Sequence, residues 1–330
     1  MKIITDLSFF RKQEYPNLVV ALGNFDGVHL GHQEILRALQ ERARAIGGTA
    51  GVFTFKEHPQ RVLHRKDDPP ILTSLEHKLF LLQKAALDLC FLIDFSIELS
   101  RKSPEAFVQE ILVKSLGAKE VCLGFNARFG HDRSGDSALM KQLAGRFGFT
   151  FFEMPPFRIE GQVISSSLIR SLVRAGKLEE VKEFLGRPYS FFGTVVQGSG
   201  RGKHLGFPTA NLDPHSEVMP PEGVYAAWVR LLDCRLSSAG EGSSRLEERV
   251  TGDHLKALLN YGKRPTFGRD SSPVPEVHIL DFHDGLVDKT VEVTVGKRLR
   301  PERTFPDPDA LRDQIRYDIE AGQKWFQEQN

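Results

Sequence analysis

The sequence predicts an α/β protein with an N-terminal parallel-sheet domain and a C-terminal antiparallel β-barrel domain that ends in a closing α-helix. Three observations predict this class. β-rich runs alternate with helical stretches in the first half, strands separated by turn residues follow, and 330 residues suffice for two cores. The pattern changes at Gly186-Arg187-Pro188, so we expect domains at residues 1–186 and 187–330.

The first half is predicted to alternate strand and helix. Apolar runs bounded by turn residues predict strands, and the amphipathic stretches between them predict helices on the faces of a parallel sheet. The predicted strands are NLVVALG, TAGVFTF, CFLIDF, KEVCLGF and FTFFEM. The predicted helices are GHQEILRALQERARAIG, residues 75–87, PEAFVQEILVKSLG, SALMKQLAGRFG, SSLIRSLVRAG and LEEVKEFLG.

The second half is predicted to be antiparallel, because Gly, Pro and Asp separate its strands in place of helices. The predicted strands are YSFFGTVV, GVYAAWVRLL, KALLNYG, PEVHILDF and VEVTVGKRL. The polar stretch RLSSAGEGSSRLEERVTGD predicts a long exposed hairpin loop. Asp and Pro at the start of DPDALRDQIRYDIEAGQKWFQ predict the N-terminus of the closing helix.

Composition excludes several classes of function. The 44 Lys and Arg nearly balance the 43 Asp and Glu, so no overall field draws the chain to nucleic acid or an acidic membrane. The chain has no bilayer-spanning apolar run and no apolar leader with a cleavage site, so we expect a cytoplasmic protein that binds small molecules. Cys90, Cys122 and Cys234 lack paired spacing and are expected to be buried. Self-association stays open.

The first predicted strand runs into GNFDGVHLGH, and a helix begins at about Gly31. Such a junction favours phosphate, because backbone N–H groups and the helix dipole attract anions. His29 and His32 are spaced to lie on one side of the helix entrance and donate to phosphate oxygens. The alternatives are a plain turn with capping histidines or, less favoured, an incomplete zinc site. The candidate residues are Gly23, Asn24, Phe25, Asp26, His29, Gly31 and His32.

A second anion site is predicted at ISSSLIR. Hydroxyls at a helix start, with Arg170 on its first turn, can hold ATP phosphates and neutralise a pyrophosphate leaving group. A serine N-cap is the alternative. The candidate hydroxyls are those of Ser165, Ser166 and Ser167. TFKEHP adds His58 and GFNARFG adds Asn126, with loop structure as the alternative for both.

The second half contains a glycine-dense loop, GTVVQGSGRG, followed by LGFPTAN. Glycines let backbone N–H groups wrap a phosphate, although a hairpin tip is the alternative. Thr209 and Asn211 can point to one side of an extended segment and bind Mg2+ together with ATP phosphates. The candidate loop residues are Gly198, Gly200, Arg201, Gly202, Gly206 and Pro208.

These motifs resemble two families in order along the chain. GNFDGVHLGH and ISSSLIR are similar to nucleotidyltransferases of the FMN adenylyltransferase type, which implies a Rossmann-like domain. GRGKHLGFPTAN, GVYA, NYGKRPTFG and EVHILDF resemble riboflavin kinase across nearly all of residues 187–330. The order matches bacterial bifunctional FAD synthetases. The resemblance implies phosphorylation of riboflavin to FMN and adenylylation of FMN to FAD, with ATP as co-substrate and Mg2+.

The resemblance also implies roles for individual residues. Glu276 becomes the general base for the ribityl 5'-hydroxyl, and a strand glutamate paired with Arg264 or Lys263 is the alternative. Asn260 and Arg300 are implied as ligand-binding residues of the same domain. Arg300 and Glu302, in LRPERTF, resemble a family element next to the flavin site, and their individual roles stay open. The FMN phosphate is implied to attack the α-phosphorus of ATP directly, so catalysis would come from positioning and charge stabilisation.

The chain departs from the family patterns at Glu57, Ala127, Tyr261 and residues 286–288. Two other functions therefore stay open. One is a monofunctional riboflavin kinase with a degenerate N-terminal nucleotide-binding domain, and the other is a flavin-binding protein without catalysis.

Overall fold

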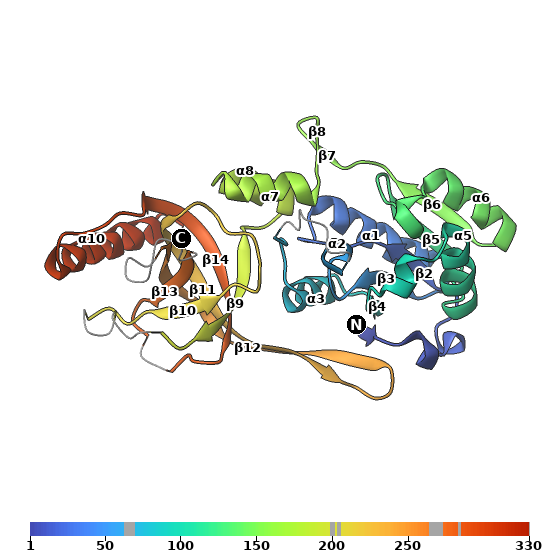
Figure 1. The fold of residues 1–330 in the computed structure, drawn as a ribbon, viewed down its shortest axis with the longest axis horizontal. Coiled ribbons are helices and arrows are strands. Elements are labelled where there is room, and N and C mark those ends of the chain that lie inside the picture. The colour runs from blue at the N-terminus through green and yellow to red at the C-terminus, as the bar shows by residue number, and fades with distance from the viewer. Residues whose placement is uncertain (63–69, 199–201, 203–205, 264–272, 283–284, 330) are drawn as a thin grey trace. The chain divides into compact units, whose positions relative to one another are not determined.

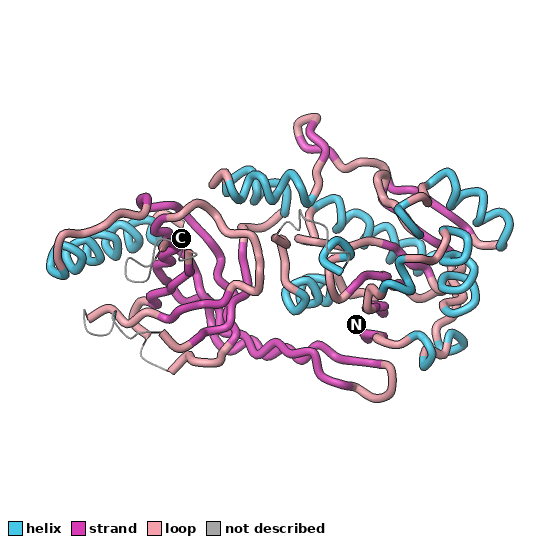
Figure 2. Tube along the Cα trace, in the orientation of Figure 1, coloured by secondary structure: helices cyan, strands magenta, loops and turns pink. Residues whose placement is uncertain are grey.

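The computed structural model describes residues 1–62, 70–198, 202, 206–263, 273–282 and 285–329. It contains two compact units, each built from discontinuous segments. The first comprises Met1–Pro69, Leu75–Ser166 and Arg235–Glu247, and the second Pro70–Ser74, Ser167–Cys234 and Glu248–Asn330. The domain limits 1–186 and 187–330 stay a prediction. Figure 1 labels the elements, and Figure 2 distinguishes helices from strands.

The first unit alternates strands and helices, as its sequence pattern predicts. Its strands are β1 (Lys2–Ile4), β2 (Val19–Leu22), β3 (Ala50–Phe55), β4 (Leu89–Ile93), β5 (Glu120–Gly124), β6 (Thr150–Met154), β7 (Arg158–Ile159) and β8 (Gln162–Val163). Its helices are α1 (Leu30–Ala45), α2 (Pro59–Val62), α3 (Leu75–Lys84), α4 (Ile97–Ser100), α5 (Pro104–Phe107) and α6 (Ser137–Phe147). Short helical turns lie at Leu7–Phe9, Lys12–Glu14 and His131–Arg133.

The main sheet of the first unit is parallel from β1 to β6, in the strand order β1-β4-β3-β2-β5-β6. Leu22, at the end of β2, pairs with Phe53 on one side and Leu123 on the other. The carboxyl ends of β2, β3 and β5 therefore lie along one edge of the sheet. The N-terminal motifs leave the sheet at this edge.

The core explains why these strands read as continuous apolar runs. Val19, Val20 and Ala21 of β2 are all completely buried, because helices cover a parallel sheet on its faces. Helix α1 packs on β2, β3 and β5 and buries Leu36 and Leu39. Its buried residues recur at helical spacing, which is the amphipathic pattern that predicted it.

The predicted helix over residues 104–117 changes its winding along its length. Ser103 caps α5, because its Oγ accepts from Ala106 N at 3.1 Å. The chain then continues over Val108–Ser115 as a wider π-type helix, in which Leu116 N donates to Ile111 O at 2.9 Å. Apolar spacing alone does not distinguish this winding from a regular α-helix.

The second unit contains an antiparallel barrel, which confirms the predicted class. Its strands are β9 (Ser190–Val196), β10 (Ala210–Asp213), β11 (Gly223–Ser238), β12 (Ser243–Gly262), β13 (Val274–Ile279) and β14 (Thr290–Pro301). The order is β11-β14-β9-β10-β13-β12, and β12 also pairs with β11, which closes six strands into a barrel. Its helices are α7 (Ser166–Arg174), α8 (Leu178–Leu185) and α10 (Pro308–Gln327).

Helix α10 closes the barrel as predicted. Asp307 caps it by accepting from Ala310 N at 2.8 Å. At its other end the Trp325 ring lies 4.7 Å from that of Trp228 on β11, and a Cβ on Gly296 would lie only 2.3 Å from the Trp325 ring. A glycine on β14 is therefore what lets the helix approach the strands.

The stretch RLSSAGEGSSRLEERVTGD forms a hairpin as predicted, but the prediction of a long loop in it was wrong. Strand β11 extends to Ser238 and β12 begins at Ser243, so the turn comprises only residues 239–242. Ser243 and Ser244 also pair antiparallel with Ile4 and Ile3 of β1. Pairing of β11 with β12, and of β12 with β1 at two residues, outweighs polar composition here, because strand formation depends on its partners more than on intrinsic preference.

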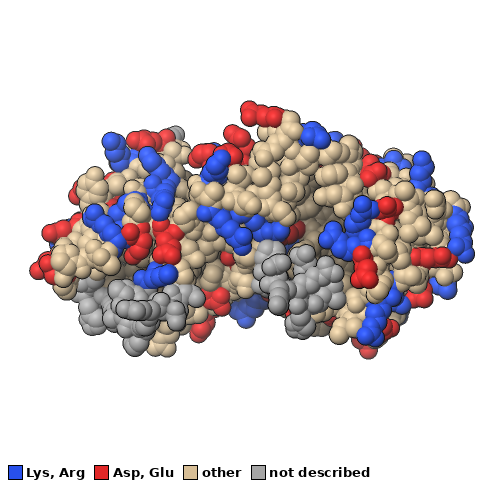
Figure 3. Space-filling model, turned by 45° about the horizontal axis from the view of Figure 1, so that its top comes forward, with Lys and Arg blue, Asp and Glu red and all other residues tan. Residues whose placement is uncertain are grey.

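The burial of the cysteines and the distribution of charge agree with what the composition predicts. Cys90, Cys122 and Cys234 are buried, and burial raises the pKa of the Cys90 and Cys122 thiols to about 12. Within the described ranges, no helix has the length and apolar character needed to cross a membrane. Figure 3 shows acidic and basic residues interspersed over the face that it draws.

Candidate active sites

The N-terminal motif forms the loop between β2 and α1. Residues 23–29 leave the carboxyl end of β2 and enter α1 directly. His58 follows β3 and Asn126 follows β5, and both strands flank β2 in parallel register. The structure therefore brings three predicted segments to one edge of the sheet, which is where open α/β sheets bind ligands.

Side-chain hydrogen bonds hold the backbone of this loop in place. They run from Thr54 Oγ1 to Asn24 O (3.3 Å), from Gln33 Nε2 to Val28 O (2.9 Å) and from Ser166 Oγ to Asp26 O (3.0 Å). Phe25 and Val28 adopt positive φ angles of 51° and 39°, which is rare for a bulky or β-branched residue. Strain held by surrounding hydrogen bonds is typical of a ligand-binding loop.

The two histidines lie together at the start of α1. His29 Nδ1 accepts from His32 N at 3.2 Å, and the two rings stack with centroids 3.7 Å apart. A Cβ on Gly31 would lie 3.2 Å from Cε1 and Nδ1 of His29, so a larger residue would crowd that ring. His29, Gly31 and His32 are thus fixed relative to one another by the N-cap hydrogen bond, by the stacking of the two rings and by the lack of a side chain at Gly31.

The environment of His32 favours its neutral form. Burial first, and then the charge of His29, hold the pKa of His32 well below its ordinary value of 6.5. The His32 Nδ1 atom is buried and has no hydrogen-bond partner within the described part of the chain. Native structures seldom leave such an atom unpaired, and a bound phosphate oxygen would accept from an N–H placed there.

Sequence reasoning missed Lys78, a buried residue of α3. Its Nζ donates to Phe55 O at 2.7 Å, at the end of β3, and lies 3.5 Å from Thr54 Oγ1. Burial lowers the pKa of Lys78 to about 8, and electrostatic interactions with Cys90 and Asp26 oppose this shift. A lysine within the apolar run LEHKLFLLQK was the available signal, since lysine is seldom fully buried.

The remaining N-terminal candidates occupy varied positions. Asn126 is exposed, and Ala127 packs against the core of the first unit while its N–H donates to Gly124 O at 2.9 Å. The turn that presents Asn126 is therefore formed despite the departure at Ala127. His58 is half-buried after β3, and the neighbouring Glu57 is exposed.

The serine run begins α7. Ser165 is half-buried just before the helix, and Ser166 binds the carbonyl of Asp26 as described above. Ser167 and Arg170 belong to the second unit, where Arg170 Nη2 donates to Ser167 Oγ at 3.0 Å. Joint action of these residues with the histidines stays a prediction.

In the barrel, three candidate residues form a row across β10, β13 and β12. Glu276 pairs with Asn211 on one neighbouring strand and with Asn260 on the other. Directly opposite residues of antiparallel strands project to the same face, with Cβ atoms about 5 Å apart. The barrel thus brings the predicted base beside a predicted metal ligand that lies far from it in sequence.

The glycine loop closes against the two predicted metal ligands. A Cβ on Gly198 would lie 1.8 Å from Asn211 Nδ2, and a Cβ on Gly202 would lie 2.8 Å from Thr209 Oγ1. Neither position accepts a side chain unless its neighbours move, and at Gly202 these neighbours include the backbone oxygen of Phe207 at 2.5 Å. This close approach, and not only backbone freedom, requires glycine at both positions.

The segment that carries these ligands is held from β13. His278 Nδ1 donates to Pro208 O at 2.8 Å, which agrees with a structural role for this histidine. Gly206, with a positive φ of 89°, makes the turn before Pro208. Two predicted phosphate-binding residues, Gly200 and Arg201, lie outside the described residues.

The residues present fit a magnesium ion shared with a nucleotide. A hydroxyl and an amide oxygen suit Mg2+, which keeps waters and phosphate oxygens as its other ligands. Asn211 is 5% exposed and Thr209 is exposed, so one ligand is fixed and the other faces an open side. Among the described residues no group of three or more His, Cys, Asp and Glu could hold a metal, so phosphates would have to complete the site.

The implied flavin element, LRPERTF, begins within β14 and continues beyond the end of this strand at Pro301. Arg300 pairs with Asp318 of α10, with Nη2 2.9 Å from Oδ2. Burial raises the pKa of Glu302, Arg300 opposes this shift, and Glu222, Glu276 and Asp318 add to it. Glu302 therefore lies within electrostatic range of the predicted base.

The chain matches two family profiles in sequence order: FAD synthetase over residues 11–168 and riboflavin kinase over residues 185–326. Similar proteins named bifunctional riboflavin kinase/FMN adenylyltransferase occur in several bacteria. That of Haemophilus influenzae is 33% identical over 93% of this chain and 94% of its own length. The corresponding values are 31%, 96% and 94% for Bacillus subtilis and 30%, 99% and 98% for Escherichia coli K12.

The fold also matches a solved structure. A protein from Streptococcus pneumoniae described as a macrolide-efflux protein superposes with a TM-score of 0.78 at 28% identity, over 98% of both chains. This likeness concerns the fold, and its description applies to that protein. From the two profiles and the relatives that span almost the whole chain, we conclude that this chain belongs to the family of bifunctional riboflavin kinase/FMN adenylyltransferases.

Proposed function

We propose that this chain makes FAD from riboflavin in two ATP-dependent steps at two sites. The barrel phosphorylates riboflavin to FMN, and the residues of the N-terminal motifs transfer AMP from ATP to FMN. The observation that carries the kinase site is the row of Asn260, Glu276 and Asn211 on adjacent strands, with Gly198 against Asn211. It supports the proposal because the Glu276 carboxylate lies beside Asn211, the proposed metal ligand, against which Gly198 of the proposed phosphate-binding loop packs.

In the kinase step the riboflavin 5'-hydroxyl oxygen attacks the γ-phosphorus of ATP, and ADP leaves. Glu276 accepts the hydroxyl proton as the new P–O bond forms. Backbone N–H groups of the glycine loop hold the phosphates. Thr209 and Asn211 would hold Mg2+, which would supply positive charge to the phosphates when bound. Asn260 and Arg300 belong to the riboflavin side of this site.

In the adenylylation step an FMN phosphate oxygen attacks the α-phosphorus of ATP, and pyrophosphate leaves. His29 and His32 donate to phosphate oxygens on which charge accumulates, and the loop of residues 23–26 holds the nucleotide. His58 and Asn126 stand at the same edge of the sheet. The serine hydroxyls and Arg170 bind the pyrophosphate portion, since a guanidinium stabilises a departing anion.

The balance of charge supports small-molecule substrates over nucleic acid or a membrane surface, and we place the reactions in the cytoplasm. Self-association of the chain is compatible with this proposal.

A single time course tests the function. The purified chain is incubated with riboflavin, ATP and Mg2+, and riboflavin, FMN and FAD are separated by chromatography. FMN should rise and then give way to FAD. Accumulation of FMN without FAD, even from supplied FMN, would instead favour a monofunctional kinase, and no conversion would favour a flavin-binding protein.

Two variants test the assignment of sites. Glu276→Ala should abolish FMN formation while FAD is still made from supplied FMN. His29→Ala should do the reverse. Loss of both activities in either variant, with folding intact, would refute two separate sites.

A further inference from the structure

We infer that Asp318 and Gln314 of α10 are positioning residues for riboflavin. They hold residues 300–303 so that Glu302 presents its carboxyl group beside Asn260 and Glu276. This inference rests on the proposed kinase function of the barrel. It assigns a role in substrate binding to a helix whose evident task is to close the barrel.

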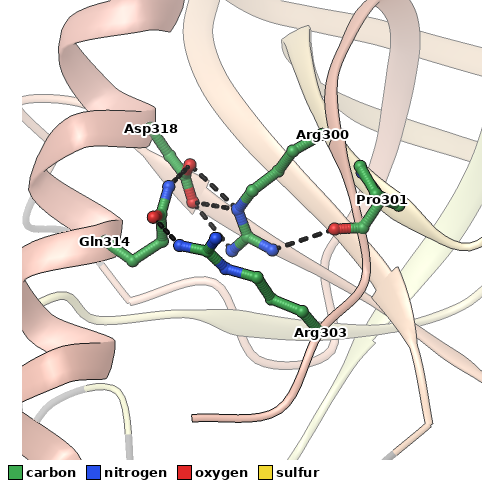
Figure 4. Close-up of polar contacts among 5 residues, drawn as sticks. All are labelled: Arg300, Pro301, Arg303, Gln314 and Asp318. Atoms are coloured by element: carbon green, nitrogen blue, oxygen red, sulfur yellow. Dashed lines mark hydrogen bonds and ion pairs between the residues drawn. The ribbon is translucent and has the colours of Figure 1, made fainter.

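The first contact of this clamp joins β14 to α10 (Figure 4). Arg300 Nε lies 3.0 Å from both carboxylate oxygens of Asp318, and Nη2 donates to Oδ2 at 2.9 Å. Arg300 Nη1 donates to Pro301 O at 3.1 Å. Every nitrogen of the guanidinium therefore contacts the protein, and the Asp318 carboxylate holds it on two nitrogens at once.

The second contact holds the other end of the segment. Gln314 Nε2 donates to Asp318 Oδ1 at 2.6 Å, and Gln314 Oε1 accepts from Arg303 Nη2. The Arg303 and Arg300 guanidinium carbons lie 4.9 Å and 5.5 Å from the centre of the Phe305 ring. One carboxylate thus organises two arginines, directly and through one amide, on the two sides of Glu302.

Burial fixes the geometry of the contact between Arg300 and Asp318. The Asp318 side chain is 4% exposed and that of Arg300 is 16% exposed. A buried ion pair contributes little net stability, but loss of one partner leaves the other charge uncompensated and free to seek a new partner. The role that this geometry supports for the Arg300–Asp318 pair is to fix the path of the chain between β14 and α10.

The fixed path sets the position of Glu302. A Cβ on Gly262, at the end of β12, would lie 2.8 Å from Glu302 Cδ and 3.0 Å from its Oε2, so the carboxyl group packs directly on the glycine. Glu302 Oε2 and Asn260 Oδ1 are both buried, and neither has a hydrogen-bond partner within the described part of the chain.

Two unpaired buried acceptors next to the predicted base suit a ligand that supplies donors, because buried polar atoms are normally paired. Riboflavin offers hydroxyl donors along its ribityl chain. Asp318 also keeps Arg300 from neutralising Glu302, since no Arg300–Glu302 ion pair forms within the described residues. Release of Arg300 would remove an acceptor from the site as well as shift the segment.

The test measures steady-state kinetics of the full chain with the variant Asp318→Asn. Its amide keeps the shape of the side chain but cannot hold both guanidinium nitrogens. The KM for riboflavin should rise about tenfold or more, because a hydrogen bond to a charged group is lost or misplaced. The KM for ATP and the adenylylation of supplied FMN should stay within twofold. A purely structural role of α10 would not separate the two KM values.

The matched control is Asp309→Asn. It removes the exposed Arg312–Asp309 pair on the same helix, where Asp309 is 83% exposed, and should change neither KM. Gly262→Ala is a second route to the same effect. Its methyl group displaces Glu302 without touching α10, so it too should raise the KM for riboflavin. Gln314→Met, which releases Arg303 and keeps the Arg300–Asp318 pair, should give a smaller rise.

An unchanged KM for riboflavin in Asp318→Asn, or an equal rise in the KM for ATP, would overturn the inference. If Asp318→Asn does not fold, an unchanged KM for riboflavin in Gln314→Met or in Gly262→Ala overturns it. These outcomes are distinct from failure of the proposed function, in which the wild-type chain itself would form no FMN.

Discussion

Replacing Gly198 by alanine tests whether the glycine loop places Asn211 for phosphoryl transfer. The new Cβ would lie 1.8 Å from Asn211 Nδ2, whereas ordinary contacts begin at 3.4 Å, so one group must retreat by about 1.6 Å. Asn211 is 5% exposed and has little room to move. A misplacement of about 1 Å in an active site can cost about 100-fold in rate. We therefore expect the kcat for FMN formation to fall about 100-fold.

The assay is FMN formation at saturating riboflavin and ATP over a series of Mg2+ concentrations. Gly198→Ala should need more Mg2+ for half-maximal rate, and adenylylation of supplied FMN should be unchanged. Gly285→Ala is the control, because a Cβ there meets nothing within 4 Å. A kcat within threefold of wild type, with the same Mg2+ dependence, would refute this reasoning. It would show that the loop moves to accommodate the new methyl group and that the position of Asn211 does not depend on Gly198.

Three further predictions concern the first unit. Gly31→Ala should lower the rate of adenylylation about tenfold, because its Cβ would lie 3.2 Å from the His29 ring and shift it, and kinase activity serves as the internal control. For His32, whose folded-state pKa lies well below 6.5, the unfolded chain binds the proton first as pH falls. The free energy of unfolding should therefore drop below pH 6.5 by up to about 1.4 kcal/mol per pH unit, and His32→Asn should flatten this slope in urea titrations. Lys78 has a pKa of about 8 in the folded chain and an ordinary pKa of 10.5 in the unfolded chain. Between pH 8 and pH 10.5 the unfolded chain therefore keeps a proton on Lys78 that the folded chain has released. The stability of wild type relative to Lys78→Met should thus rise from pH 8 towards pH 10, and a constant difference would contradict the burial of its ammonium group.

The order of elements was predictable from the sequence because helix and strand periodicities are local. The apolar runs of β2, β3, β4, β5 and β6 and the amphipathic pattern of α1 appear within short windows of sequence. Glycines and prolines mark the change from helices to turns at the barrel. The motifs GNFDGVHLGH and LGFPTAN were equally readable, since each combines its chemistry in one continuous segment.

Only the tertiary structure decided which distant segments meet. The row of Asn211, Glu276 and Asn260 depends on strand register, and register is set by pairing between strands that lie far apart in the chain. The clamp of Arg300 by Asp318 likewise joins a strand end to a helix face, and each residue alone reads as an ordinary surface charge.

The same reason explains the two failures of the sequence analysis. The polar hairpin was predicted as a loop because its polar, Gly/Ser-rich composition gives no strand pattern, and its pairing with β1 joins segments far apart in the chain. Lys78 was overlooked because it lies on a helix and its acceptor, the carbonyl of Phe55, lies on strand β3, in a separate segment of the chain. The sequence by itself determined most of the elements, their order and the chemistry carried by each motif. The structure decided pairing, burial and neighbours, because these depend on contacts between segments that no local pattern records.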